Sequence, residues 1–378
     1  MKILVTGSKG FLGRNLVENL KNIMDGKSKK YPQTNLEILE FDIDTPSEKL
    51  EEYALQADFV YHLAGVNRPK DVSEFYSGNS DLTTRVINAL KQGENPPLMI
   101  SSTIWADKDN DYGKSKRSAE ESVLNYSKET GAKSLVYRFT NLFGKWTRPS
   151  YNSVVATFCY NIANNLPIAI NDENAQVTLT YIDDVVYELI DALFGKEHRN
   201  GEFCFVPKTY TVTLGELASK IKLFKELNKQ AFTPDCEDEF TKKLYAMYLT
   251  YVPSEDLAFN SKTNCDERGS FTELYKSAHG EQVSLNVVKS GKIKGNHWHN
   301  TKIERFTVIS GQGVIRLRKI GDTKVIEYFS KNGEVLNVDI PAGYTHNMEN
   351  LGQEDMVVII WCNEPFDPSN PDTFFEEV

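Results

Sequence analysis

Three histidines and one glutamate near the C-terminal end have the spacing of metal ligands. His297, His299 and Glu304 lie in one short segment, and His346 ends a second segment that begins at Pro341. Residues two apart on a strand share one face, so His297 and His299 could bind one ion together. Imidazoles with one carboxylate suit Zn, Ni, Fe or Mn, and zinc is our preferred choice. The alternative is a metal-free site in which the histidines only form hydrogen bonds.

A hydroxyl, a phenol and an ammonium form a second candidate site. Tyr112 and Lys116 are four residues apart, so on a helix they are neighbours on one face. A cation there is expected to lower the phenol pKa from its usual ~10, which would let Tyr112 exchange a proton at neutral pH. The apolar run 98–100 precedes Ser102 and Thr103, and we expect Thr103 to supply the hydroxyl, with Ser102 as the alternative.

A glycine-rich segment, Thr6 to Gly13, follows the apolar run Ile3 to Val5. It opens a stretch in which Leu12, Leu16 and Leu20 lie on one helical face. Glycines in this context allow a tight turn and let a pyrophosphate approach the N-terminus of the helix. The segment predicts a dinucleotide-binding turn, although an ordinary glycine-rich turn would look similar. The residues expected to contact the coenzyme here are Gly7, Gly10, Phe11, Leu12, Gly13 and Arg14.

The choice of coenzyme depends on two further side chains. Asp42 follows the apolar run 36–41, where a carboxylate would bind the ribose hydroxyls and repel a 2'-phosphate. That position favours NAD, but Asp42 could equally be a solvated strand end, and Arg14 could bind the extra phosphate of NADP. The sequence leaves NADP and NAD open.

The hydrophobic pattern changes along the chain. The first half alternates short apolar runs with helical intervals, which predicts a Rossmann-like, doubly wound parallel α/β sheet. From about Val283 onward, short strands with turn signals predict an all-β barrel or sandwich. Pro253 follows a charged helical stretch, so we place the boundary there and expect domains of residues 1–252 and 253–378.

Composition limits the function classes. A chain of 378 residues exceeds one ordinary core, and its net charge of -10 argues against nucleic acid or an anionic membrane as a partner. The five cysteines lack a Cys-x-x-Cys pair and no apolar run reaches membrane-spanning length, so we expect a cytoplasmic enzyme. A diphosphate substrate would need a local cation, for which we select Arg148, then Lys145. A solvated surface role for Arg148 is the alternative.

The first part of the chain, over roughly residues 1–245, resembles the extended short-chain dehydrogenase/reductase family. Besides the glycine turn and the Tyr-x-x-x-Lys pair, the resemblance rests on the segments His62 to Gly65, Arg138 to Gly144 and Tyr181 to Val185. It implies that Thr103 orients the substrate, that Tyr112 is the general acid or base, and that Lys116 binds the coenzyme ribose. The resemblance also implies coenzyme contacts from Leu63, Ala64 and Gly65 and a substrate contact from Asn141.

The histidine segments resemble the two cupin motifs, which implies a jelly-roll barrel with His297, His299, Glu304 and His346 as metal ligands. Asp266 to Phe271 is similar to the opening of the dTDP-4-dehydrorhamnose 3,5-epimerase type of cupin. That group inverts carbons beside a sugar ketone, a reaction that a metal assists by polarising the carbonyl.

Over almost its whole length the chain resembles a family of two-domain capsular polysaccharide enzymes. The resemblance rests on the domain order and on the segments 141–146, 151–154, 294–299 and 366–373. It implies cupin-catalysed C-3 epimerisation of a UDP-2-acetamido-2,6-dideoxy-4-hexulose, a UDP-linked 4-keto-6-deoxy-hexosamine. NAD(P)H-dependent reduction of the 4-ketone would then give UDP-N-acetyl-6-deoxy-talosamine, on the route to N-acetyl-fucosamine, and we expect a homodimer. The alternatives are a single-function reductase whose cupin serves dimerisation or sugar binding, and an NAD(P)-sensing regulator.

Overall fold

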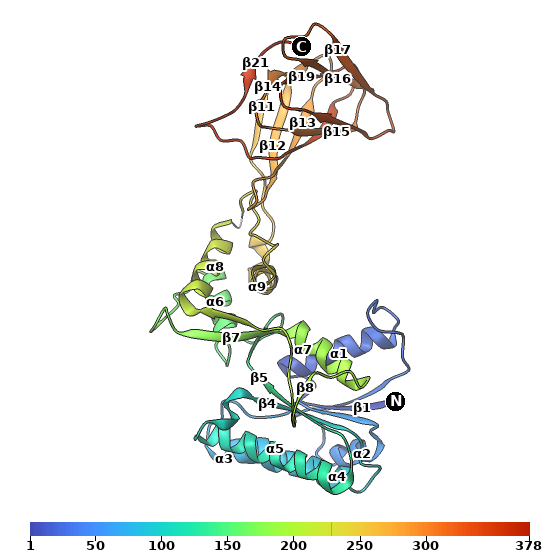
Figure 1. The fold of residues 1–378 in the computed structure, drawn as a ribbon, viewed down its shortest axis with the longest axis vertical. Helices are drawn as coiled ribbons and strands as arrows, with labels where there is room; N and C mark the ends of the chain where they lie inside the picture. Colours follow the sequence, from blue (N-terminus) through green and yellow to red (C-terminus); the bar gives the residue numbers. More distant parts are fainter. Residues whose placement is uncertain (228) are drawn as a thin grey trace. The chain divides into compact units, whose positions relative to one another are not determined.

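The chain forms two compact units (Figure 1). The computed structural model describes residues 1–227 and 229–378. The first unit comprises Met1–Ile221 with Ala246–Tyr251, and the second comprises Lys222–Tyr245 with Val252–Val378. Residues 222–245, which the sequence pattern grouped with the N-terminal domain, therefore lie in the second unit. The backbone explains this, because the Thr233 amide donates a hydrogen bond to the carbonyl of Lys276 on β12, and the Lys276 amide donates to the carbonyl of Ala231.

The first unit is built on a seven-stranded sheet in the order β2-β1-β3-β4-β5-β9-β8. All neighbours pair in parallel except β8 and β9. This confirms the predicted Rossmann-like parallel sheet. The strand order reverses between β1 and β3, and in open α/β sheets ligands bind at the carboxyl ends of strands at such a point. The strands are β1 (Lys2–Thr6), β2 (Glu37–Phe41), β3 (Phe59–His62), β4 (Leu98–Thr103), β5 (Ser134–Phe139), β8 (Arg199–Asn200) and β9 (Phe203–Cys204).

Helices cover both faces of this sheet. Figure 1 shows α1 and α7 on one face and α2, α4 and α5 on the other. Buried apolar side chains form a separate core on each face, because strands covered on both sides present apolar residues in both directions. The helices are α1 (Phe11–Met24), α2 (Lys49–Gln56), α3 (Ser73–Phe75), α4 (Leu82–Leu90), α5 (Asp111–Thr130), α6 (Val154–Ala163), α7 (Ile182–Leu193), α8 (Leu214–Leu227) and α9 (Glu239–Leu249), with the shorter turns η1 (Tyr76–Asp81), η2 (Ile104–Asp107) and η3 (Ser254–Asp256).

A small sheet and two larger ones complete the fold. The strands β10 (Tyr210–Thr213), β7 (Gln176–Tyr181) and β6 (Asn141–Phe143) form the small sheet of the first unit. In the second unit a six-stranded sheet has the order β11-β12-β13-β20-β15-β18, and a five-stranded sheet has the order β17-β16-β19-β14-β21. Every pair in these two sheets is antiparallel.

The two antiparallel sheets enclose a common apolar core, to which Phe306 and Val358 of one sheet and Ile315 and Met348 of the other contribute. Their strands are β11 (Thr263–Asp266), β12 (Gly269–Lys276), β13 (Gln282–Val288), β14 (Ile293–Trp298), β15 (Glu304–Ser310), β16 (Gly313–Lys319), β17 (Val325–Ser330), β18 (Leu336–Ile340), β19 (Tyr344–Asn350), β20 (Met356–Cys362) and β21 (Phe374–Phe375). The expected β-rich C-terminal domain is thus confirmed. Within the part of the chain described, no helix has the length and apolarity to cross a membrane.

Candidate functional site

The glycine turn connects β1 to α1 in the first unit and packs against the segment that follows β3. A Cβ atom added to Gly7 would lie 2.7 Å from the backbone nitrogen of Ala64, and one added to Gly13 would lie 2.0 Å from the carbonyl oxygen of Gly7. The backbone here is therefore too closely packed for larger residues. Helix α1 begins directly after Gly10, whose position provides no side-chain cap, so the first-turn amides are available to an anion.

The side chains at the predicted adenosine end are partly engaged. The Asp42 carboxylate accepts hydrogen bonds from the amides of Lys9 at 2.7 Å and Ile43 at 2.8 Å, so it braces the glycine turn. The Arg14 guanidinium stacks over the ring of Trp146, 4.4 Å from its centroid. Trp146 has a φ of +69°, which is unusual for a residue with a side chain. Both predicted selectivity residues thus lie near the turn, and their geometry is compatible with either coenzyme.

Thr103, Tyr112 and Lys116 come together at the carboxyl end of β4 and the start of α5. Burial of the Tyr112 phenol raises its pKa, and the nearby Thr103 side chain only partly opposes that rise. The expected lowering of the Tyr112 pKa by Lys116 is therefore not found, because desolvation of the phenol outweighs the influence of Thr103. The Lys116 ammonium is buried and donates a hydrogen bond to the Ser101 carbonyl at 3.1 Å.

Lys116 also reaches the segment that is predicted to contact the coenzyme. A Cβ atom on Gly65 would be 3.0 Å from its Nζ atom, so the ammonium reaches the segment that follows β3. Burial lowers the pKa of Lys116 to about 8, although the Glu120 carboxylate acts in the opposite direction. The Lys116 ammonium loses hydration when it is buried, and a hydrogen bond to an acceptor such as a ribose hydroxyl would offset that loss.

Ser102, the alternative hydroxyl, is committed elsewhere. It donates a hydrogen bond to the buried Glu120 carboxylate, which also binds the Arg138 guanidinium through two bonds of 2.7 and 2.9 Å. Since strand residues alternate between faces, adjacent Ser102 and Thr103 point in opposite directions. The geometry therefore brings Thr103, and not Ser102, to Tyr112.

The sequence reading missed a buried polar network behind this site. His62 binds the Thr6 hydroxyl through Nδ1 at 2.7 Å and the Thr83 hydroxyl through Nε2 at 2.9 Å. Thr83 in turn donates to the carbonyl of Asn79, whose side chain donates to the Ser115 hydroxyl. These contacts link the glycine turn to helix α5. Asn79 lies in the π-helical turn η1, a feature that no local sequence pattern marked.

The predicted substrate residues lie after β5. Asn141, at the start of β6, donates a hydrogen bond to the Thr178 carbonyl at 3.2 Å. The Lys145 ammonium is paired with Asp183. The Arg148 guanidinium lies over the ring of Tyr151, 5.5 Å from its centroid. Because Lys145 already has an anionic partner, Arg148 is the better candidate of the two to bind a substrate phosphate.

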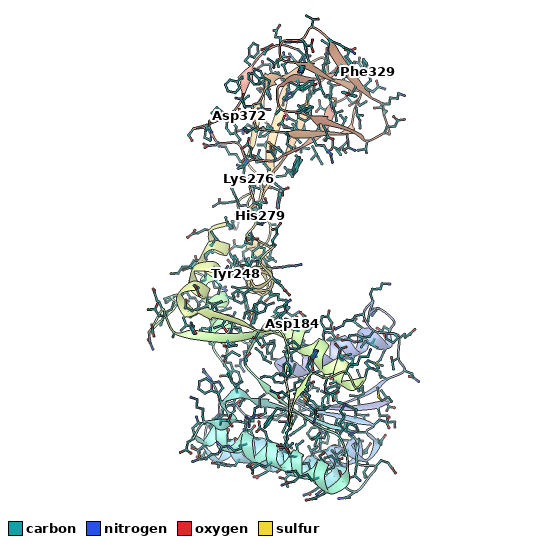
Figure 2. All side chains as sticks on the ribbon, viewed as in Figure 1. Asp184, Tyr248, Lys276, His279, Phe329 and Asp372 are labelled. Carbon is teal, nitrogen blue, oxygen red and sulfur yellow. The ribbon has the colours of Figure 1, made fainter. Side chains whose placement is uncertain are left out.

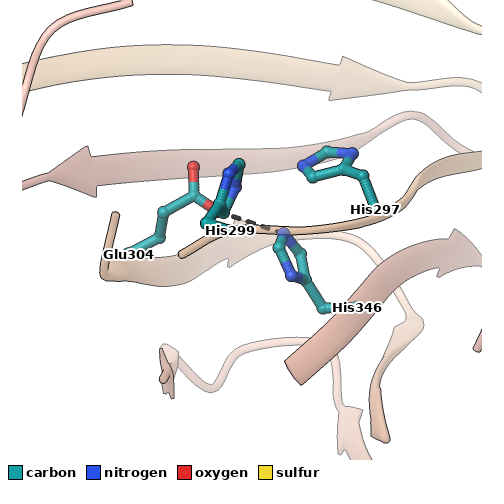
Figure 3. A group of neighbouring side chains, drawn as sticks. All are labelled: His297, His299, Glu304 and His346. Atoms are coloured by element: carbon teal, nitrogen blue, oxygen red, sulfur yellow. Dashed lines mark ion pairs between the residues drawn. The ribbon is translucent and has the colours of Figure 1, made fainter. Parts of the chain in front are cut away.

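In the second unit, His297, His299, Glu304 and His346 converge (Figure 3). One ligand atom from each lies within 4.8 Å of the others. The Glu304 Oε2 atom is 3.1 Å from His346 Nε2 and 3.5 Å from His299 Nε2. These three atoms are buried and none has a hydrogen-bond partner of acceptable geometry. Buried polar atoms left without partners cost about 1–3 kcal/mol each, so the arrangement fits a bound cation that would satisfy them together.

The backbone orients two of the three imidazoles. The Nδ1 atoms of His299 and His346 donate to the carbonyls of Asp372 and Tyr344, at 2.5 and 3.2 Å. A hydrogen on Nδ1 leaves Nε2 as the free ligand atom. Burial, with the neighbouring imidazoles, lowers the pKa of His297 to about 4, which keeps this ring in the neutral form that binds metals.

Glu304 supplies the negative charge of the cluster. Burial opposes its ionisation, but the neighbouring His299 and His346 rings hold its pKa well below the usual range. The cluster opens into a cavity of about 550 Å³, whose other polar lining residues include Asn286, Lys294 and Lys302. A neutral imidazole set, one carboxylate and an adjoining cavity provide metal ligands beside a space for a substrate.

Comparisons with known proteins cover both units. Residues 3–202 match the model of the NAD dependent epimerase/dehydratase family, and residues 264–374 match the polysaccharide biosynthesis C-terminal domain. A UDP-2-acetamido-2,6-beta-L-arabino-hexul-4-ose reductase of Pseudomonas aeruginosa is 38% identical over 99% of this chain and 98% of the relative.

Solved structures give the same grouping. The capsular polysaccharide assembling protein CapF of Staphylococcus aureus is 44% identical, with full coverage of both chains and a TM-score of 0.91. A UDP-glucuronic acid 4-epimerase of Bacillus cereus, solved with UDP-glucuronic acid and NAD, covers 68% of this chain and 100% of its own at 19% identity, with a TM-score of 0.53. The latter likeness shows the fold alone.

Proposed function

This chain belongs to the NAD-dependent epimerase/dehydratase family, as a full-length relative of CapF, and we propose that it is a bifunctional enzyme of nucleotide-sugar metabolism. Its first domain, for which we keep the boundary placed at Pro253 and thus residues 1–252, would reduce the 4-ketone of a UDP-linked 6-deoxy-hexosamine. Its second domain, residues 253–378, would be a metal-binding cupin jelly roll that first epimerises C-3. The substrate class follows the names of the full-length relatives and the chemistry of the two sites.

The reductase assignment rests most directly on the placement of Thr103 at the end of β4 and Tyr112 at the start of α5, with the buried Lys116 one helical turn further along α5. Bound NADPH or NADH would supply the hydride to C-4. Thr103 would hold the ketone oxygen, and the Tyr112 phenol would donate the proton that this oxygen needs as the carbonyl becomes an alcohol. The Lys116 ammonium would bind the coenzyme ribose and favour the phenolate left after transfer.

The epimerase assignment rests on the orphaned atoms of His299, Glu304 and His346. A divalent metal, with zinc as our first choice, would polarise the ketone as a Lewis acid. The four side chains would hold it, and the cavity would admit the sugar ring. Epimerisation must precede reduction, because the C-3 hydrogen is acidic only while the neighbouring ketone is present.

A homodimer is supported by the outer edge of the five-stranded sheet. Strand β17 lies at that edge, and Phe329 on it is 56% exposed (Figure 2). Val325, Ile326 and Tyr328 on the same strand are also exposed. An apolar edge strand is a surface that proteins normally cover. Light scattering should give twice the chain mass, and Phe329→Lys should shift it toward one chain mass.

This surface also favours the second candidate function, a single-function reductase that uses its C-terminal domain for dimerisation or sugar binding. In either case the free thiols of all five cysteines fit a reducing compartment, and we place the enzyme in the cytoplasm. The test of the main proposal is NMR of the product formed from the UDP-4-hexulose, reduced coenzyme and this protein in D₂O. Inversion and deuterium at C-3 would support both activities, whereas a reduced product with unchanged C-3 would leave only the reductase.

A further inference from the structure

A β-bulge places Lys294 on the same face of β14 as the candidate metal ligand His297. Lys294 pairs with Met348 and His297 pairs with His346, with a register shift between them at Asn296. Met348 and His346 are two residues apart on β19 and therefore point to the same face of the sheet. Their partners Lys294 and His297 point to that face too, although they are three residues apart in the sequence. Asn296 is the extra residue and has a φ of +60°. Bulges commonly re-aim a side chain in this way next to active sites.

The Lys294 side chain crosses the interior between the two sheets. Its amine donates hydrogen bonds to the Ser270 carbonyl on β12 at 2.9 Å and to the Asn286 side-chain oxygen on β13 at 3.1 Å. Among the described residues these are the two acceptors of the amine. The amine nitrogen is tetrahedral, and two of its hydrogens are used by these two acceptors. The remaining position carries a lone pair when the amine is neutral and a third hydrogen when it is charged. That position can therefore accept and return a proton.

Lys294 lines the same cavity of about 550 Å³ as His297, His299 and Glu304. Two acidic residues that line this cavity are engaged by other cations. Asp266 forms an ion pair with Arg268 at 2.6 Å, and the Glu273 carboxylate is 3.0 Å from the Lys276 ammonium.

The charges facing Lys294 decide how readily its amine is neutral. Burial lowers the pKa of Lys294, Arg268 acts in the same direction, and Asp266 and Cys265 oppose them. The net lowering increases the fraction of neutral amine near pH 7. This direction agrees with the geometry, which already provides a position for a transferred proton.

We propose that Lys294 is the acid–base residue that removes the C-3 proton beside the substrate ketone. The proposal rests on the epimerase activity proposed above. In this step the C-3–H bond breaks, the proton moves to the Lys294 nitrogen, and the bonding pair forms the C-3 to C-4 double bond of an enolate whose charge lies on the C-4 oxygen. Water then supplies a proton to the opposite face of C-3, and the ammonium returns its own proton to solvent.

The experiment measures deuterium incorporation at C-3 in D₂O without coenzyme, so that reduction cannot contribute. Lys294→Met should lower the exchange rate by about 10²–10⁴-fold, the usual contribution of a positioned base. Lys294→Arg should be equally slow, because a guanidinium keeps the charge but does not release its proton. Metal content of both variants should equal that of the natural protein. Lys292→Met, an exposed lysine outside the cavity, is the matched control and should exchange normally.

A second readout separates a base from a packing residue. Added methylamine should restore part of the exchange in Lys294→Ala and leave the natural protein unaffected. Normal exchange in metal-loaded Lys294→Met, or full exchange in Lys294→Arg, would overturn the inference while the epimerase proposal stands. Absence of exchange in the natural protein would instead overturn the epimerase proposal and this inference with it.

Discussion

The Nδ1 atom of His299 donates a 2.5 Å hydrogen bond to the backbone carbonyl of Asp372, 73 positions later in the chain. The Asp372 carboxylate accepts hydrogen bonds from the amides of Asn300, Thr301 and Lys302 at 2.9–3.2 Å. Figure 2 marks this residue in the C-terminal segment. One residue of the tail thus holds both the ring of a candidate metal ligand and the loop that follows it.

Asp372→Ala should weaken metal binding by about 10–100-fold, because partners behind a ligand fix its orientation and basicity. Competition with a chromophoric chelator measures this affinity, and the absorption spectrum of the Co²⁺ form reports the ligand geometry. Asp367→Ala, which removes only local hydrogen bonds from the amide and the hydroxyl of Ser369, is the control and should bind metal normally. An unchanged affinity and spectrum in Asp372→Ala would show that the tail does not orient His299.

Tyr112→Phe should lower coenzyme oxidation by about 10²–10⁴-fold and leave coenzyme binding intact, because the phenol donates the proton but Lys116 remains. Ketosugar-dependent loss of reduced coenzyme absorbance measures the first effect, and fluorescence titration measures the second. An undiminished rate in this variant would remove Tyr112 from the mechanism.

His62 should make the stability of the first unit sensitive to acid. Burial, together with Lys116, lowers the pKa of His62 to about 3 in the fold, whereas it is near 6.5 when unfolded. The unfolded chain therefore binds the proton first, so this contribution is complete above pH 6.5 and is lost as the pH falls toward 3. The melting temperature of the first unit should fall as the pH is lowered over this range, and it should fall less in His62→Gln. Parallel pH curves for the two proteins would contradict the assignment.

Arg148→Ala should raise the Michaelis constant for the sugar nucleotide without changing coenzyme affinity, since the guanidinium would bind the diphosphate. Steady-state kinetics with each substrate varied in turn measures both. Lys128→Ala, on the last turn of α5, serves as the charge-matched control. If Arg148→Ala and the control have equal Michaelis constants for the sugar nucleotide, Arg148 has no role in binding it.

The sequence predicted those features that depend on local patterns. The parallel sheet, the β-rich C-terminal part and the four clustered metal-ligand candidates all follow from periodicity or from motifs only a few residues long. The sequence favoured Thr103 and kept Ser102 as the alternative, because the two differ in which face of β4 each occupies.

Features that depend on tertiary contacts could not be read from the sequence. The bulge at Asn296 shifts the strand register by one residue, so that Lys294 and His297 share a face. A strict period-two pattern would place Lys294 on the opposite face. The Asp372 contact joins residues 73 positions apart. The direction of the Tyr112 pKa depends on how deeply the phenol is buried, which residue spacing does not contain.

The measurement that tests the bifunctional account most directly compares two activities in one variant, His297→Asn. Removing one imidazole leaves an incomplete set of ligands, so the metal should be weakly held and deuterium incorporation at C-3 should collapse. The first unit has its own cores, so the variant should still bind coenzyme and reduce a ketosugar offered to it. The account predicts this separation: exchange lost, coenzyme oxidation retained. Exchange at the normal rate in a folded, metal-free variant would contradict it, because the metal would then have no part in epimerisation.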